Sequence, residues 1–181
     1  MSRVGKKPIT IPEKTKLTYT DTDRVLTVEG GKGRLTREIN AEVELKIEGG
    51  EVQVVSPKAD RQGLALQGLT RSLVSNMIIG VNQGFERVLE INGIGYRAEL
   101  SGKQIVFNIG YSHPINFDLP EGVAATVERN NVIKLSCINK ETLGQTAAAI
   151  RRLRPPEPYK GKGIKYAEEI IRKKAGKTGT K

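Results

Sequence analysis

The sequence has almost none of the residues that build metal centres, disulfides or the commoner catalytic sites. Cys137 is the only cysteine, His113 is the only histidine, and tryptophan is absent. One cysteine excludes an intrachain disulfide, and one residue of each kind cannot make a Cys/His zinc site. The carboxylates are dispersed along alternating segments, without a pair suited to general acid–base work. The sequence therefore predicts no metal, no cofactor and no enzymatic activity.

A leader sequence and a long hydrophobic run are missing as well. The opening MSRVGKKPITIP is basic but has no apolar run behind it, which argues against a signal peptide. No stretch is expected to reach the length of a membrane span. Aromatic residues make up only 4% of the chain, so the cores must be aliphatic. We expect a cytoplasmic protein without a membrane partner.

What the sequence has in excess is positive charge, and this charge lies at its two ends. The net charge is +10; residues 1–16 hold five Lys/Arg and one Glu, and residues 151–181 hold 11 basic and three acidic residues. The body between them is close to neutral, with 14 basic and 16 acidic residues. Basic ends on a neutral body indicate a polyanionic partner, most often nucleic acid. A membrane surface is the competing partner, but no basic segment is strongly amphipathic.

Hydrophobic periodicity shows the same pattern twice along the chain. Short alternating segments are followed by helical spacing over residues 60–81, with Asp60 as N-cap, and then by more alternating segments and a second helix from about residue 139 or 140 to 153. The copies align with a shift of eighty residues, which places Gly30 on Gly110. A short third helix is predicted over 166–174, and residues 175–181 are expected to be disordered.

These patterns predict an α+β fold of two tandem similar domains. Each domain has a small, mostly antiparallel sheet with one packed helix, and the chain adds a basic N-terminal arm and a C-terminal tail. We place the first repeat with its arm at residues 1–82, the second repeat at 83–154, and a basic RNA-binding extension at 155–181.

The strongest candidate site is the stretch RRLRPPEPYKGKGIKY at residues 151–166. Three arginines end the second helix, prolines stop it, and cations then alternate with glycines beside tyrosines. Lysines attract phosphates, glycines permit close backbone approach, and the rings of Tyr159 and Tyr166 can stack on unpaired bases. The alternative interpretation is a basic tail that is exposed to solvent and has no binding role. The predicted RNA-binding residues are Arg151, Arg152, Arg154, Tyr159, Lys160, Gly161, Lys162, Gly163 and Lys165.

Other motifs in the chain favour structural interpretations. The segment 30–33, GGKG, lies between predicted strands and reads as a hairpin loop, because it lacks the ending of a phosphate loop. The segment 93–97, GIGYR, lacks a third glycine and a following helix, so we expect a turn or bulge. Cys137 is expected to be a buried, inert thiol. His113 is expected in a loop, as a structural or RNA-contacting residue.

The segment PEPYKGKGI at residues 156–164 resembles the C-terminal signature of bacterial large-subunit ribosomal protein six. The opening SRVGKKPITIP, GIGYRA at 93–98 and GYSHP at 110–114 are also similar to that family, so the resemblance runs nearly end to end. It implies two duplicated α+β domains and binding of 23S-type rRNA, mainly by the second. It also implies a place near the sarcin–ricin region and the base of the factor-binding stalk, beside other ribosomal proteins and close to translational GTPases.

The resulting hypothesis is a structural, RNA-binding protein of the large ribosomal subunit. The alternative is a general nucleic-acid-binding adaptor that uses the same charges without specificity. An enzyme acting on RNA through His113 is a second alternative, which the missing acid–base pair disfavours.

Overall fold

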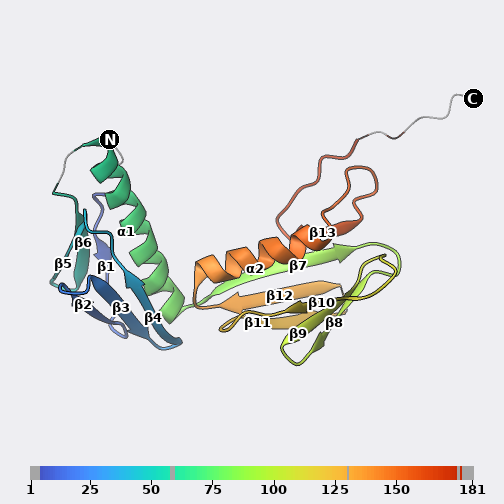
Figure 1. Ribbon diagram of the computed structural model, residues 1–181, viewed down its shortest axis with the longest axis horizontal. Coiled ribbons are helices and arrows are strands. Elements are labelled where there is room, and N and C mark those ends of the chain that lie inside the picture. Colours follow the sequence, from blue (N-terminus) through green and yellow to red (C-terminus); the bar gives the residue numbers. More distant parts are fainter. Residues whose placement is uncertain (1–4, 58–59, 130, 175, 177–181) are drawn as a thin grey trace, which may run out of the picture. The chain divides into compact units, whose positions relative to one another are not determined.

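Figure 1 shows a computed structural model of the protein, which describes residues 5–57, 60–129, 131–174 and 176. The chain divides into two compact units. Unit 1 comprises Met1–Gly84 with Ile138–Lys140, and unit 2 comprises Phe85–Cys137 with Glu141–Lys181. The boundaries at 82 and 154, understood as limits of separately folding domains, stay predictions. The predicted disorder of 175–181 concerns residues that, apart from Gly176, lie outside the described ones.

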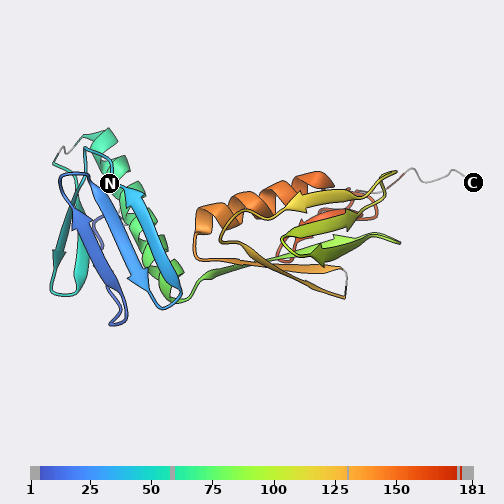
Figure 2. The same cartoon turned by 60° about the horizontal axis from the view of Figure 1, so that its bottom comes forward.

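Unit 1 holds two three-stranded antiparallel sheets and one long helix (Figure 1, Figure 2). One sheet has the order β2-β3-β4 and the other the order β1-β6-β5. The bounds are β1 Ile9–Thr10, β2 Lys16–Thr20, β3 Val25–Gly30, β4 Gly33–Glu38, β5 Glu44–Glu48, β6 Glu51–Val55 and α1 Arg61–Asn82. The segment GGKG joins β3 to β4, so its prediction as a hairpin loop is confirmed.

Helix α1 begins where the sequence predicts. The Asp60 side chain accepts a hydrogen bond from the backbone N–H of Gly63 at 2.6 Å, which satisfies one of the free donors of the first turn. Its buried face, with Val74, Ile78 and Val81, packs in the core of unit 1.

The expectation that no stretch reaches membrane-spanning length is wrong for α1. The helix is long and apolar enough to cross a membrane by length and composition. A core helix passes the same test, and α1 contacts β3, β4 and β6.

The basic N-terminal arm is held on unit 1. Strand β1 pairs with β6 through Ile9 and Val52, and Ile9 is buried. Arg71 of α1 donates from Nε to the carbonyl of Lys7 at 3.2 Å, while the side chains of Lys6 and Lys7 are exposed. Arg3, which belongs to the same predicted arm, lies outside the described residues. The arm therefore contributes an edge strand as well as charge.

Unit 2 repeats the topology of unit 1. Its sheets have the orders β8-β9-β10 and β11-β12-β7-β13, so β13 is the one strand without a counterpart in the first unit as described. The bounds are β7 Phe85–Asn92, β8 Arg97–Ser101, β9 Gln104–Asn108, β10 Ile115–Asp118, β11 Ala124–Glu128, β12 Val132–Cys137, α2 Lys140–Leu153 and β13 Gly163–Tyr166. The predicted α+β fold with two similar repeats is thus confirmed, with two sheets in each repeat.

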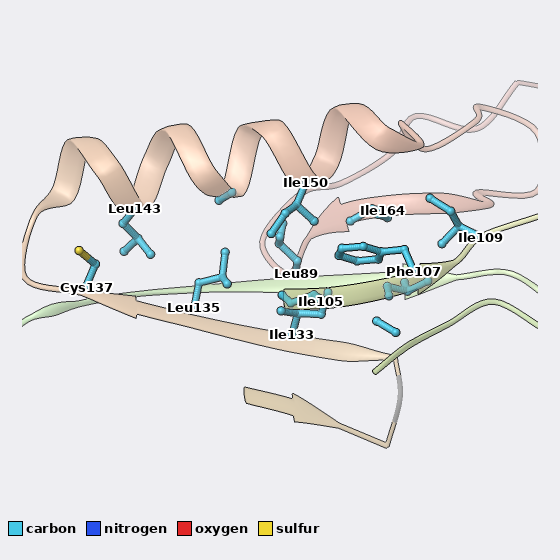
Figure 3. Packing of buried hydrophobic residues seen from close by; sticks show 13 residues of the cluster. Leu89, Ile105, Phe107, Ile109, Ile133, Leu135, Cys137, Leu143, Ile150 and Ile164 are labelled. Carbon is cyan, nitrogen blue, oxygen red and sulfur yellow. The ribbon is translucent and has the colours of Figure 1, made fainter. Parts of the chain in front are cut away.

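The core of unit 2 lies between α2 and the sheet that contains β7 and β12 (Figure 3). Leu143 and Ile150 of α2 point toward Leu89 and Leu135 on the strands, and all four are buried. Cys137 belongs to this cluster and is 7% exposed, so the expectation of a buried thiol is confirmed. Ile164 of β13 is fully buried in the same core, which joins the C-terminal segment to the fold.

The predicted terminal helix over 166–174 is wrong. Tyr166 ends β13 opposite Leu89, and the N–H of Ala167 donates to the carbonyl of Val88 at 3.0 Å. A helix this short is marginal in water, whereas the edge of β7 offers backbone partners for a whole strand. Two glutamates of this segment stand four positions before basic residues, a spacing that suits pairing along a helix. In the structure they make tertiary ion pairs instead, Glu168 with Arg87 and Glu169 with Arg151.

Candidate nucleic-acid interface

The candidate site is built on the loop that connects α2 to β13. Two backbone hydrogen bonds close this loop, from Ile164 N–H to Arg154 O at 2.7 Å and from Glu157 N–H to Lys162 O at 2.9 Å. Gly161 has φ +75°, a conformation that glycine adopts without strain. The loop is therefore a defined surface feature, closed against the end of the helix.

The loop forms one side of an open groove of about 420 Å³. Tyr159 is 55% exposed, and its neighbour Lys160 is exposed as well. The groove thus presents cations and aromatic rings together, the combination that binds unstacked nucleotides. The residues that line it are Tyr96, Arg154, Pro155, Glu157, Tyr159, Lys160 and Lys162.

Arg154 is oriented by two tyrosines from loops, Tyr96 in the loop before β8 and Tyr111 in the loop before β10. Its guanidinium carbon lies 4.9 Å from the ring centre of Tyr111 and 5.8 Å from that of Tyr96. The hydroxyl of Tyr111 donates to the carbonyl of Leu153 at 2.9 Å, which ties this ring to the end of α2. The arrangement fixes one cation of the groove and leaves Tyr111 47% exposed.

Two glycines make room for the ring of Tyr96. A Cβ on Gly93 would lie 2.4 Å from this ring, and a Cβ on Gly110 would lie 2.8 Å from it. The N–H of Tyr96 donates to Gly93 O at 3.2 Å, so the segment GIGYR forms the expected turn, with strand β8 beginning at Arg97. The tyrosine–arginine stack was not predicted from the sequence. The signal for it was a glycine close to a tyrosine in both GIGY at 93–96 and GY at 110–111.

The nine predicted RNA-binding residues do not share one environment. Arg154, Tyr159, Lys160 and Lys162 line the groove, Gly161 lies in its loop, and Arg152 is exposed on the last turn of α2. Gly163 is buried at the start of β13. Lys165 makes an ion pair with Glu90 of β7 at 2.7 Å.

Arg151 also has an acidic partner within the chain. Its Nε donates to Glu169 Oε2 at 2.8 Å, and its Nη2 donates to the other oxygen of the same carboxylate. These hydrogen bonds are the main cause that lowers the pKa of Glu169 and raises that of Arg151, against the opposing effect of partial burial. Arg151 therefore holds the C-terminal segment to α2.

Tyr166, a second predicted stacking face, already has two arginines of this chain over its ring. The guanidinium of Arg87 lies 5.7 Å from its ring centre, and that of Arg151 lies 5.9 Å from it. Tyr159 carries the more accessible ring of the two.

Replacing Glu169 with glutamine is expected to destabilise unit 2 by about 1 kcal/mol at neutral pH, because the change removes a charged, bidentate acceptor at a partly exposed site. The pKa of Glu169 is lowered from its ordinary value of 4.5, so the pair stabilises the fold above about pH 4.5 and ceases to do so as pH falls through the lowered pKa. Urea unfolding of the wild type and of Glu169→Gln, repeated from pH 7 to pH 3, should show that the difference in their unfolding free energies shrinks as the pH falls. A constant difference would contradict this role.

The single histidine and the single cysteine lie in different environments, since His113 is in an exposed loop and Cys137 is in the core of unit 2. His113 lies in the loop before β10, exposed, with its Nδ1 3.3 Å from Ser112 Oγ. Within the described ranges, no group of three His, Cys, Asp or Glu residues is arranged to hold a metal ion.

The two-repeat architecture corresponds to a known protein family. The family described as Ribosomal protein L6 matches residues 11–84 and again residues 92–167. The "Large ribosomal subunit protein uL6" of Desulfosudis oleivorans is 60% identical over 178 residues, which cover 98% of this chain and 99% of that protein. Proteins of the same name from Desulfatibacillum aliphaticivorans and a Nostoc species are 60% and 50% identical, over 99% of this chain and 99% and 97% of their own lengths. The chain belongs to the ribosomal protein L6 family.

Proposed function

We propose that this ribosomal protein binds large-subunit rRNA through the groove of unit 2, as a structural constituent of the large subunit in the cytoplasm. The observation that carries the proposal is the meeting of Arg154, Lys160 and Lys162 with the exposed ring of Tyr159 on one groove. The relatives' name, which places them in the large ribosomal subunit, supports this partner.

In this proposal the residues of the groove have separate roles. Lys160 and Lys162 contact phosphates, Arg154 adds a cation whose direction Tyr96 and Tyr111 set, and Tyr159 stacks on a base. Arg152 extends the basic edge along α2. Arg151 and Lys165 act through the fold, because Glu169 and Glu90 neutralise their charges locally.

Changing Lys160 and Lys162 together to glutamine should weaken binding to a large-subunit rRNA fragment and flatten its salt dependence. Each phosphate contact releases counterions, so losing two contacts lowers the slope of log K against log salt by about 1.5. Filter binding of the full chain across a range of salt concentrations measures both effects.

The control is Lys14→Gln with Lys16→Gln, which removes the same charge from two exposed positions of unit 1. The general nucleic-acid-binding adaptor would be favoured if both double variants weakened rRNA binding equally and if tRNA displaced the rRNA fragment as well as unlabelled rRNA does. An unchanged slope in the Lys160/Lys162 variant would refute both phosphate contacts.

The position near the sarcin–ricin region and the stalk base, among other ribosomal proteins and close to translational GTPases, follows from the family resemblance and is part of the proposal. An Ile170→Cys variant carrying an iron chelate, changed at a side chain that is 95% exposed in the same C-terminal segment, would map it by cleavage of nearby rRNA, since the native Cys137 is buried. Cleavage confined to distant rRNA would contradict this position.

A further inference from the structure

One carboxylate stands among the cations of the groove. Glu157 lines it together with Arg154, Lys160 and Lys162, yet in the described part of the chain its carboxylate makes no ion pair within 4.0 Å. The side chain is only partly exposed. A negative charge at this place repels phosphates, so it lowers affinity for RNA unless the RNA donates hydrogen bonds to it.

The backbone holds Glu157 in place before any ligand arrives. Pro156 and Pro158 restrict the chain on both sides, and the Glu157 N–H is bonded to Lys162 O at 2.9 Å. The backbone that carries this acceptor is thus fixed, and Glu157 lines the same groove as the exposed Tyr159. Such an arrangement suits reading the edge of a base that stacks on the ring.

We propose that the groove binds one unstacked guanine nucleotide of RNA, with the Glu157 carboxylate accepting hydrogen bonds from guanine N1–H and N2–H. This inference rests on the proposed function. Guanine is the base whose Watson–Crick edge presents two adjacent donors, matching the two oxygens of a carboxylate; adenine, cytosine and uracil present a single donor group there. The ring lies on Tyr159, and the phosphate contacts Lys160 and Lys162. The volume of about 420 Å³ is within the ordinary range for small-ligand sites.

The sign of one substitution tests the proposal. Glu157→Gln should weaken rRNA binding by about tenfold, although it makes the protein more positive, because an amide cannot accept both bonds. The matched control is Glu121→Gln, which removes the same charge from an exposed position in the loop before β11. Binding by Glu157→Gln equal to or tighter than binding by Glu121→Gln would overturn the guanine site. The Lys160/Lys162 double variant separates the two ideas: if it binds normally, the proposed function itself fails.

A second readout uses mononucleotides and the full chain. Titration of the ¹⁵N-labelled protein with 5′-GMP should shift the backbone amides of Tyr159 and Gly161 at lower concentration than 5′-IMP, which lacks the 2-amino group. Glu157→Gln should remove the preference for GMP. Equal shifts by GMP, IMP and AMP, or no shifts with GMP at millimolar concentration, would overturn the assignment.

Discussion

Replacing Gly163 with alanine is expected to destabilise unit 2 by about 3 kcal/mol and to weaken rRNA binding. Gly163 has φ +132°, and a Cβ there would lie 2.6 Å from the carbonyl oxygen of Pro155 and 2.8 Å from that of Arg154. Both obstacles are backbone atoms at the point where Ile164 N–H bonds to Arg154 O, so no side-chain rotation relieves the contact. Closing the loop that carries Lys160 and Lys162 therefore depends on this glycine.

The control for Gly163→Ala is Gly161→Ala in the same loop. Gly161 also has a positive φ, +75°, but a Cβ there meets nothing within 4 Å. Both variants carry backbone strain, and only the first adds a backbone clash. Urea unfolding followed by tyrosine fluorescence reports mainly on unit 2, which holds four of the five tyrosines. Equal unfolding free energies for the two variants would show that the close approach of Gly163 to the Arg154 and Pro155 carbonyls does not constrain the loop.

The elements that sequence reasoning predicted correctly are those fixed by local periodicity. Asp60 caps α1 as expected because an aspartate before a helical apolar pattern satisfies free N–H groups whatever the rest of the fold does. The duplication was visible because buried faces recur with a shift of eighty residues, which places β3 on β9 and β6 on β12.

The elements that it missed depend on partners far away in the chain. The segment 166–174, YAEEIIRKK, has acidic and basic residues at the i,i+4 spacing that suits a helix. Nothing in the local sequence reveals that the edge of β7 pairs with Gly163–Tyr166. Arg151 reads as a phosphate ligand until Glu169 is found 2.8 Å away. The grouping of Arg154 with Tyr96 and Tyr111 joins residues more than forty positions apart. Charge can be counted from the sequence, but which charges are already neutralised requires the fold.

The role of the C-terminal segment in RNA binding is better tested by point substitutions than by truncation. Ending the chain at Leu153 would remove β13 together with the lysines, leaving the edge of β7 unpaired and a core position empty. Loss of RNA binding by such a truncation would follow from unfolding as readily as from loss of contacts. Point substitutions in the full chain separate the two effects, because Lys160 lies in the loop and Ile164 lies in the core.

Ile164→Ala is expected to lower the unfolding free energy of unit 2 by about 3 kcal/mol, the usual cost of emptying a fully buried isoleucine site. The control, Ile170→Ala, removes the same atoms from a side chain that is 95% exposed in the same segment, and should change stability by less than about 0.5 kcal/mol. Under conditions where unit 2 stays folded, the slope of rRNA binding against salt should be unchanged in both variants, because neither removes a cation. Equal stability of the two would mean that β13 is an appendage of the sheet and that the groove is held by the loop alone. A large loss for Ile164→Ala only would show that the segment carrying the lysines is anchored through the core of unit 2.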